Sequence, residues 1–288
     1  MIDLVIQARD LPTAAVDAFG AAIPARRVQR RLNSARLQDV QNDAETRRVA
    51  QALGQYFRCD WAFVPATLRL ADFRLLALDM DSTLINIESL DELAALAGKG
   101  PQVAAITEAA MRGEVADYAE SLRRRVALLA GVEAALLERV YAERLRLNEG
   151  AETLLRTCRD AGLKTLLVTG GFTFFTERMR ARLGFDFTRA NELHIAGDRL
   201  TGEVTGPDGG PIVDAAGKAQ ALREACAAVG CTCTQAIVIG DGANDLGMMK
   251  LAGVSVAFRA KPLVRAQATY TLDYTPLSGV LALFADVP

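Results

Sequence analysis

Histidine and long apolar runs are scarce in this chain, and each scarcity argues against a class of protein. Its 288 residues include one histidine, His194, and one tryptophan. A zinc centre built on several histidines, or a Ser-His-Asp triad, would depend on that single imidazole, so both are disfavoured. We expect His194 to lie on a polar strand or turn surface. No apolar run approaches the roughly twenty residues of a membrane span, so we expect no membrane partner.

The charge balance is equally plain. There are 33 basic and 35 acidic side chains, which gives a formal net charge of −2. No basic stripe with interleaved aromatic residues is present, and this argues against a nucleic-acid partner. The first residues, 1–7, lack a basic stretch followed by a long apolar one, so we expect no signal peptide and a cytoplasmic location.

Cysteine is also sparse, with five residues in the whole chain. That number does not make a disulfide framework in a protein of this length. Cys226, Cys231 and Cys233 lie close together in sequence, which would suit a soft metal or redox chemistry, but tetrahedral zinc needs four ligands. We interpret these three as structural or incidental thiols.

The most informative segment is Asp79-Met80-Asp81-Ser82-Thr83, which follows the apolar run 75–78. It places two carboxylates where a buried strand opens into a loop. A lone Asp-x-Asp is most often a turn with local backbone hydrogen bonds. Further features of the chain are therefore needed to favour a site.

Two other apolar strands end in polar groups. Residues 164–168 lead to Thr169-Gly170-Gly171, and residues 236–240 lead to Asp241, Asn244 and Asp245, while Lys218 opens an Ala-rich helical stretch between them. In an open parallel sheet the ligand crevice lies outside the carboxyl ends of the strands, so these groups should meet there. Carboxylates, a hydroxyl and an ammonium group suit a phosphate and Mg²⁺ site.

At these residues the chain resembles the haloacid dehalogenase-like phosphatases, and more closely the phosphoserine phosphatases. The resemblance runs from about Leu75 to the C-terminus. It covers four motifs in order: Asp79 to Thr83, Thr169 to Phe172, Lys218, and Gly240 to Asp245. One departure is Thr169, where phosphoserine phosphatases usually have serine. The resemblance implies an α/β fold with a Rossmann-like parallel-sheet core and a helical cap insertion.

Chemistry and resemblance together suggest roles for the acidic residues. Asp79 would attack phosphorus and form an aspartyl phosphate once Mg²⁺ and Lys218 neutralise the phosphoryl oxygens. Asp81 would protonate the departing oxygen and later activate water. Asp241 would complete the metal site with the Asp79 side chain and, as the family implies, the backbone carbonyl of Asp81.

The remaining polar groups at the strand ends would bind substrate or support the loop. Thr169, the Gly170 N–H and Asn244 would contact phosphoryl oxygens or nearby substrate atoms. Asp245 would orient Lys218. Asn244 and Asp245 also stand where helix caps are favoured, and a capping role is the alternative for both.

Substrate choice should reside in the insertion at about 89–148, whose apolar spacing over 121–130 and 133–147 predicts helices. Tyr118, Leu122, Val126 and Leu129 form one apolar stripe, and Arg125 falls at its margin, so Arg125 turns inward more easily than its two arginine neighbours. Its guanidinium suits a substrate carboxylate. Glu88 could bind an α-amino group or could stabilise a helix N-terminus.

The first part of the chain, 1–68, reads as a separate small α+β module that precedes the phosphatase unit at 69–288. Strand and helix patterns alternate in the order βαββαβ. The pattern resembles the ferredoxin-like or ACT-like regulatory domain of some bacterial phosphoserine phosphatases. Such a module could bind an amino acid, or it could join two copies as a homodimer through an edge strand. The reading that we favour is a dimerisation module or a stabilising appendage.

We therefore expect a Mg²⁺-dependent phosphomonoesterase that hydrolyses O-phospho-L-serine, the last step of L-serine biosynthesis. Another small phosphometabolite as substrate, or transfer of the phosphoryl group to an alcohol, remains open. A non-catalytic amino-acid sensor is a further alternative, disfavoured by the intact set of Asp79, Asp81, Lys218 and Asp241.

Overall fold

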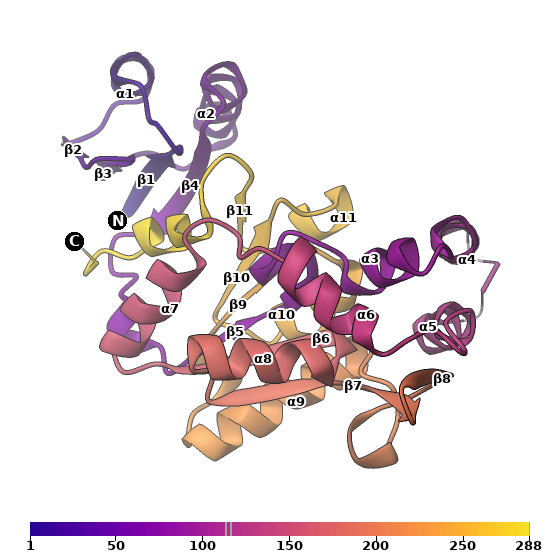
Figure 1. Cartoon of the computed structure of the whole chain (residues 1–288). Helices are drawn as coiled ribbons and strands as arrows, with labels where there is room; N and C mark the ends of the chain where they lie inside the picture. The colour runs from indigo at the N-terminus through magenta and orange to yellow at the C-terminus, as the bar shows by residue number, and fades with distance from the viewer. Residues whose placement is uncertain (113, 116, 288) are drawn as a thin grey trace.

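The chain folds around two β-sheets, a small one at the N-terminus and a large one that carries most of the remaining strands (Figure 1). A computed structural model describes residues 1–112, 114–115 and 117–287. The N-terminal and C-terminal segments lie close together, on the side of the molecule where the small sheet meets the large one.

The small sheet has the expected βαββαβ order. Its four strands are antiparallel and lie in the order β2-β3-β1-β4. Its elements are β1 Ile2–Gln7, α1 Thr13–Ala22, β2 Arg27–Arg30, β3 Ser34–Gln38, α2 Ala44–Phe57 and β4 Asp60–Pro65. Alternation along β1 separates two faces: Leu4 and Ile6 pack under the helices, whereas Val5 packs into the main core.

The large sheet has seven strands in the order β11-β10-β9-β5-β6-β7-β8. All neighbouring pairs are parallel except β7 and β8, which form an antiparallel hairpin at one edge. The strands are β5 Leu75–Leu78, β6 Lys164–Phe172, β7 Phe187–Ala196, β8 Arg199–Thr205, β9 Ala236–Gly240, β10 Val254–Phe258 and β11 Tyr270–Leu272. The parallel sheet with helices confirms the expected α/β class.

Helices cover both faces of this sheet, because its central strands are apolar on both sides. Leu76 and Leu78 of β5 pack in one buried cluster with α7 Ala151–Asp160 and α8 Thr173–Leu183. Leu75 and Ala77 pack in the opposite cluster. The helices on that side are α9 Ala215–Val229, α10 Leu246–Met249 and α11 Pro262–Arg265.

A helical insertion lies between β5 and β6, over the carboxyl ends of the strands (Figure 1). It contains α3 Ser89–Leu96, α4 Gly100–Met111, α5 Tyr118–Ala127 and α6 Ala135–Arg139. Two details differ from the sequence-based expectation: α5 begins three residues before the predicted start at 121, and the predicted helix 133–147 is a short α6 continued by a π-type turn, Val140–Arg144. Asp117 caps α5 by accepting a hydrogen bond from the Glu120 N–H, which explains the earlier start.

The small module is fastened to the C-terminal part of the chain by buried charged groups. Asp60 on β4 accepts hydrogen bonds from the backbone N–H groups of Asp273, Tyr274 and Thr275. Arg36 on β3 pairs with Asp3 at 3.2 Å and donates to the carbonyls of residues 282 and 283. The two sheets therefore share one continuous interface.

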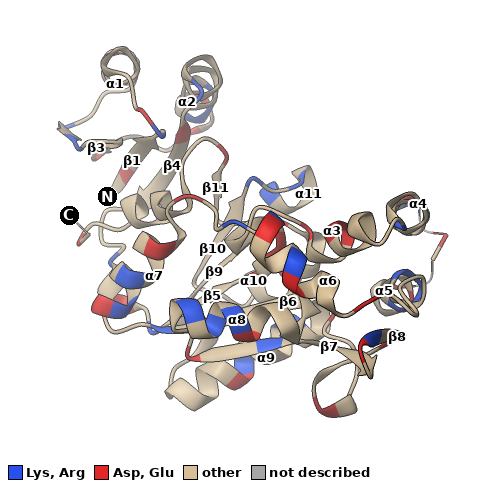
Figure 2. Cartoon of the chain, viewed as in Figure 1, with Lys and Arg blue, Asp and Glu red and all other residues tan. Residues whose placement is uncertain are grey.

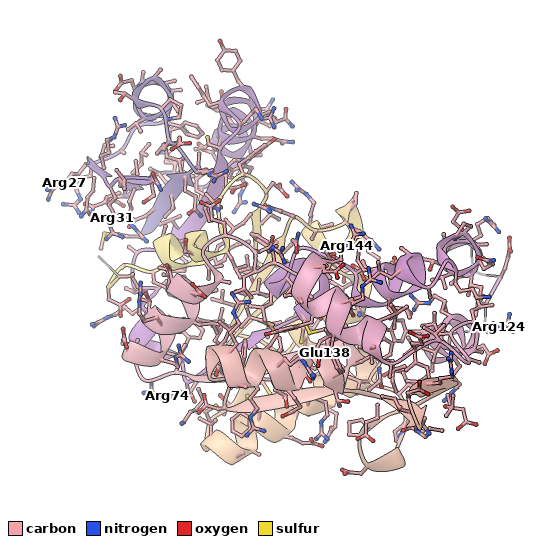
Figure 3. All side chains as sticks on the ribbon, in the orientation of Figure 1. Arg27, Arg31, Arg74, Arg124, Glu138 and Arg144 are labelled. Atoms are coloured by element: carbon pink, nitrogen blue, oxygen red, sulfur yellow. The ribbon has the colours of Figure 1, made fainter. Side chains whose placement is uncertain are left out.

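Strand β2 forms an exposed edge of the small sheet and is rich in arginine. All four of its residues are exposed. Figure 2 shows basic residues at this tip, and in Figure 3 Arg27 and Arg31 point outward from it. The sequence contains four arginines within 26–31, so this edge carries a dense positive charge.

Other expectations from composition concern single side chains. His194 lies on β7 with its ring partly exposed and its Nε2 atom 3.0 Å from the Thr205 hydroxyl, which confirms a polar strand surface. All five cysteines are free thiols. Over the described residues, no helix combines the length and the apolar character that crossing a membrane requires.

Candidate active site

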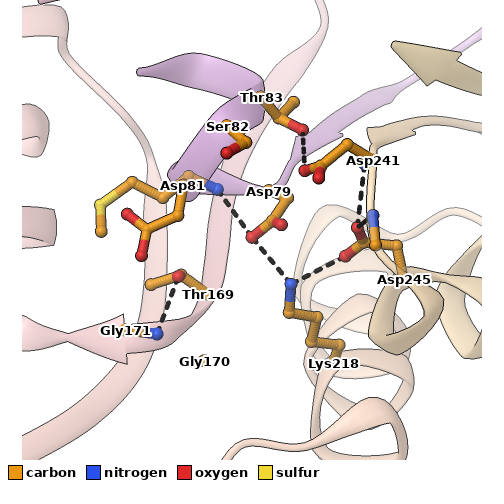
Figure 4. Close-up of polar contacts among 12 residues, drawn as sticks. Asp79, Asp81, Ser82, Thr83, Thr169, Gly170, Gly171, Lys218, Asp241 and Asp245 are labelled. Atoms are coloured by element: carbon orange, nitrogen blue, oxygen red, sulfur yellow. Dashed lines mark hydrogen bonds and ion pairs between the residues drawn. The ribbon is translucent and has the colours of Figure 1, made fainter. Parts of the chain in front are cut away.

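The groups predicted at the three strand ends do meet at one edge of the large sheet (Figure 4). Asp79 follows β5 and is 5 % exposed. Lys218, in the first turn of α9, is fully buried and places its Nζ atom 2.7 Å from both Asp79 Oδ1 and Asp245 Oδ1. The lysine thus stands between a carboxylate from β5 and one from the segment after β9.

The loop after Asp79 makes a tight π-type turn over Met80–Leu84. Asp79 Oδ1 accepts a hydrogen bond from the Met80 N–H, which fixes the carboxylate at the start of the turn. Ser82 adopts a left-handed conformation with φ 56°, uncommon for a residue with a side chain. In that conformation its hydroxyl donates to Glu88 Oε1 at 2.7 Å.

Asp81 is held in the same loop but by different partners. Its Oδ2 atom accepts hydrogen bonds from the N–H and the hydroxyl of Ser89, at 3.2 and 2.8 Å. Its Oδ1 atom is buried without a hydrogen-bond partner among the described residues. Burial, and secondarily the charge of Glu88, raise the pKa of Asp81 to about 8. The carboxyl group therefore carries a proton at neutral pH and can donate it.

The end of β6 brings a hydroxyl and two glycines beside Asp81. The Thr169 hydroxyl accepts a hydrogen bond from the Gly171 N–H at 2.9 Å. A Cβ atom at Gly170 would lie 2.0 Å from the Tyr118 hydroxyl oxygen. Only glycine permits the cap to approach the strand end so closely.

The segment after β9 supplies the remaining carboxylates. Asp241 Oδ1 accepts a hydrogen bond from the Thr83 hydroxyl at 3.0 Å. Asp245 is fully buried, and its Oδ2 atom accepts from the N–H groups of Asp241 and Gly242. Because its other oxygen binds Lys218, Asp245 both shapes this loop and orients the lysine.

The carboxylates leave a surplus of negative charge at the site. Oxygens of Asp79, Asp241 and Asp245 lie within 4.8 Å of one another. Burial, followed by the neighbouring Asp245, raises the pKa of Asp79 well above its usual range and that of Asp241 to about 6. Burial alone would lower the pKa of Lys218, but Asp245 and Asp79 raise it, so the lysine stays charged.

This acidic group fits a bound cation. Asp245 already bonds Lys218 and two backbone N–H groups, so the second oxygens of Asp79 and Asp241 are the ones available to an ion. The Asp81 side chain is not part of this group.

Above these residues lies a cleft of about 720 Å³ between the core and the cap. Arg125 lines it, whereas Arg123 and Arg124 are exposed on the outside of α5. Lys218 and Asp245 are buried beneath this cleft. The other candidate site residues from the sequence line it: Asp79, Asp81, Glu88, Arg125, Thr169, Gly170, Asp241 and Asn244.

Several polar residues at the site were not identified from the sequence. Asp91 and Lys261 line the cleft, and Thr83 and Ser89 bond Asp241 and Asp81. Thr83 lies inside the first motif, so its position was a usable signal. Ser89 reaches Asp81 only because the turn after β5 folds back, and no sequence pattern marks it.

Comparison with known proteins agrees with this geometry. Residues 76–250 match the family model described as haloacid dehalogenase-like hydrolase. A phosphoserine phosphatase of Polaromonas sp. is 56 % identical over 216 residues, which cover 75 % of this chain and 92 % of that protein.

Two solved structures resemble nearly the whole chain. A probable phosphoserine phosphatase from Vibrio cholerae has a TM-score of 0.83 at 32 % identity and covers 98 % of this chain and 86 % of its own. A haloacid dehalogenase family hydrolase from Salmonella enterica has a TM-score of 0.85 at 30 % identity, with 99 % of both chains covered. Both matches extend over the N-terminal module.

The fold, the carboxylate and lysine cluster and the family match define a hydrolase: the chain belongs to the haloacid dehalogenase-like hydrolases. It is a phosphomonoesterase of that family. Within the family it belongs to the phosphoserine phosphatases.

Proposed function

We propose that this chain hydrolyses O-phospho-L-serine to L-serine and phosphate through a phosphorylated Asp79. The observation that carries the proposal is the placement of Lys218, 2.7 Å from Asp79, at the base of a cleft that Glu88 and Arg125 also line. Lys218 suits a phosphoryl group, and Glu88 and Arg125 suit the two charged groups of an amino acid.

In the first step an oxygen of Asp79 attacks phosphorus and the bond to the serine oxygen breaks. Asp81 gives its proton to that oxygen, so that neutral serine hydroxyl leaves. Lys218 faces the phosphoryl oxygens as a fixed positive charge and lowers the repulsion between two anions. Thr169, the Gly170 N–H and Asn244 orient the same oxygens.

In the second step a water molecule attacks the phosphorus of the aspartyl phosphate. Asp81, now ionised, takes a proton from that water, and the bond between phosphorus and the Asp79 oxygen breaks. Phosphate leaves, Asp79 is again a carboxylate, and Asp81 is again protonated. The cycle consumes only water and substrate.

We propose Mg²⁺ as the cation, held by Asp79, Asp241 and the Asp81 backbone carbonyl. When bound, it would neutralise the phosphoryl oxygens and so make attack by a carboxylate feasible. Oxygen-only ligands and a small number of carboxylates are what Mg²⁺ prefers. The raised pKa values of Asp79 and Asp241 support the proposal: burial and the neighbouring Asp245 disfavour their charged forms, and a bound cation would favour those forms.

Arg125 and Glu88 are the residues that favour phosphoserine as the substrate. The Arg125 guanidinium suits the substrate carboxylate, and Glu88 suits the α-ammonium group. Glu88 is already oriented by the Ser82 hydroxyl. These two residues favour an amino acid but do not distinguish water from an alcohol as the acceptor.

We further propose that residues 1–68 act as a module distinct from the catalytic unit at 69–288, and that the reaction serves L-serine biosynthesis in the cytoplasm. The separate small sheet supports the division. The five free thiols suit a reducing compartment.

The test is phosphate release from a panel of phosphorylated metabolites, with Mg²⁺ and again with EDTA. We expect a strong preference for phosphoserine over phosphothreonine and 3-phosphoglycerate, and loss of all activity in EDTA. Equal turnover of esters without an amino group would contradict the roles of Glu88 and Arg125. Transfer of the phosphoryl group to an alcohol in place of water would yield a new phosphate ester of that alcohol and less free phosphate.

A further inference from the structure

The cap joins the core through two adjacent segments, 84–86 on the way out and 146–148 on the way back. They form a short antiparallel ribbon with a bridge between Ile85 and Leu147. The Asn86 N–H donates to the Arg146 carbonyl at 3.0 Å, and the Asn148 N–H donates to the Leu84 carbonyl at 2.9 Å. The two cap hinges are therefore linked directly to each other.

The side chain of Asn148 extends this link into the loop after Asp79. Asn148 is 9 % exposed, and its Nδ2 atom lies 2.9 Å from the Thr83 carbonyl and 3.1 Å from the Ile85 carbonyl. Both neighbours are acceptors only, so the amide must present its NH₂ group to them. With its backbone N–H on Leu84, Asn148 satisfies three consecutive carbonyls of the loop.

Those carbonyls belong to the segment that orients two groups of the site. Thr83 holds Asp241 through its hydroxyl at 3.0 Å. Ser82, in its left-handed conformation, holds Glu88 at 2.7 Å. A shift of this loop would therefore move a carboxylate of the acidic cluster and a carboxylate of the substrate cleft together.

We propose that Asn148 is a positioning residue that couples the returning hinge of the cap to both the cation site and the amino-acid site. The proposal deepens the proposed function and rests on it for the role of Glu88. Asn148 touches no substrate; it acts through the backbone of residues 83–85. It keeps Asp241 and Glu88 in register when the cap is seated on the core.

Asn86 provides a matched control on the same ribbon. Its Oδ1 atom accepts a hydrogen bond from the Arg146 N–H at 2.8 Å, in an exposed position. It supports the ribbon without contacting the carbonyls of residues 83 and 85. A variant at Asn86 therefore weakens the hinge but leaves the loop bonds in place.

The experiment compares Asn148→Ala, the milder Asn148→Ser and Asn86→Ala with the unchanged protein. Mg²⁺ binding is measured by calorimetry without substrate, and KM and kcat are measured for phosphoserine and for p-nitrophenyl phosphate, which has no amino group. We expect Asn148→Ala to raise both the Kd of Mg²⁺ and the KM for phosphoserine about tenfold, the effect of losing about one hydrogen bond. For Asn148→Ser, both constants should lie between those of Asn148→Ala and those of the unchanged protein. For Asn86→Ala, both constants should match those of the unchanged protein.

At saturating Mg²⁺ the KM for p-nitrophenyl phosphate should change little in any variant. Thermal midpoints identify variants that fail to fold, and Asn148→Ser then carries the comparison. If Asn148→Ala lowers only the thermal midpoint, or changes all constants as Asn86→Ala does, the residue is merely structural and the proposal is wrong. If the unchanged protein cleaves p-nitrophenyl phosphate but not phosphoserine, the proposed substrate fails, while the Mg²⁺ titration still decides the role of Asn148.

Discussion

At the scale of single residues, the site depends on how burial and neighbouring charges set the protonation of a few carboxyl groups. Asp79 and Asp81 are two residues apart, yet their environments differ. Asp79 faces the charged Lys218, whereas Asp81 faces Ser89 and a buried space with no partner for one oxygen among the described residues. Burial raises the pKa of both groups, but the ion pair with Lys218 favours the charged form of Asp79, which suits a nucleophile, whereas protonated Asp81 suits a proton donor.

Replacing Asp79 by Asn tests the nucleophile. We expect kcat to fall at least about a thousandfold, because no other carboxylate occupies its place. The fold should persist, since Lys218 keeps Asp245 as a partner and a buried negative charge is removed. Phosphate release and the thermal midpoint measure the two effects. Undiminished turnover would exclude an aspartyl phosphate on this residue.

Ser89→Ala tests the proton donor through its pH dependence. The acid step needs protonated Asp81, so kcat/KM should fall as the pH rises through about 8 in the unchanged protein. The Ser89 hydroxyl stabilises the charged form of Asp81, and its removal raises the pKa of Asp81 further. The alkaline fall should therefore move to higher pH. An unchanged pH profile would show that Asp81 does not limit the rate in this range.

Arg125→Ala tests the contact proposed for the substrate carboxylate. We expect KM for phosphoserine to rise about tenfold to a hundredfold, the range for a lost hydrogen bond to a charged group, with p-nitrophenyl phosphate unaffected. Arg124→Ala is the control, because Arg124 pairs with Glu120 on the exposed side of the same helix. Equal effects of the two variants would remove Arg125 from the substrate site.

At the scale of elements, the strands and the site motifs were predictable because their signals are local. Apolar runs such as 75–78 identify buried strands, and polar residues directly after them mark the crevice edge. The apolar stripe of Leu122 and Val126, which are both buried, was sufficient to predict that Arg125 faces the cleft.

What the sequence could not predict depends on contacts between distant segments. Asn148 lies more than sixty positions from the carbonyls it binds, and no periodicity marks it. The extent of the last cap helix was overestimated, because its apolar spacing continues through the π-type turn Val140–Arg144 and cannot distinguish the two conformations.

Strand β2 offers a prediction at this scale about self-association. Pairing of two copies through β2 would bring like-charged arginines opposite one another, an arrangement that disfavours edge-to-edge contact. A dimer formed through this edge should therefore tighten as salt rises from about 0.05 M to about 0.5 M, because screening reduces the repulsion. Analytical ultracentrifugation at each salt concentration measures the dissociation constant of the dimer. A dimer that weakens with salt would place the interface on another surface.

At the scale of the whole molecule, the N-terminal module packs directly against the catalytic part, in addition to being joined to it by the chain. Its sheet is apolar on both faces, one under its own helices and one against the main core. Asp60 and Arg36 add buried polar contacts to the same interface. Any signal received by the module would thus be transmitted through packed contacts.

Asp60→Ala tests how much this interface contributes to the stability of the folded protein. The variant leaves three backbone N–H groups and the Thr275 hydroxyl without their acceptor. We expect the free energy of unfolding to fall by about 2–4 kcal/mol, with the constants for p-nitrophenyl phosphate unchanged. Chemical denaturation followed by circular dichroism measures the loss, and the exposed Asp72→Ala serves as control. No loss of stability would mean that water replaces Asp60 at little cost.

The hydrogen bonds between Asp60 and Thr275 join residues that are 215 positions apart in the sequence. During synthesis, they can form only some time after residue 60 has been added. At about 5–20 residues per second, a ribosome that has just added residue 60 needs roughly 10–40 s to reach residue 275. During that interval the inner face of the small sheet has no C-terminal segment to cover it. The nascent chain must therefore keep an exposed apolar sheet from aggregating until its last segment emerges, and chaperones would be expected to engage it in this window.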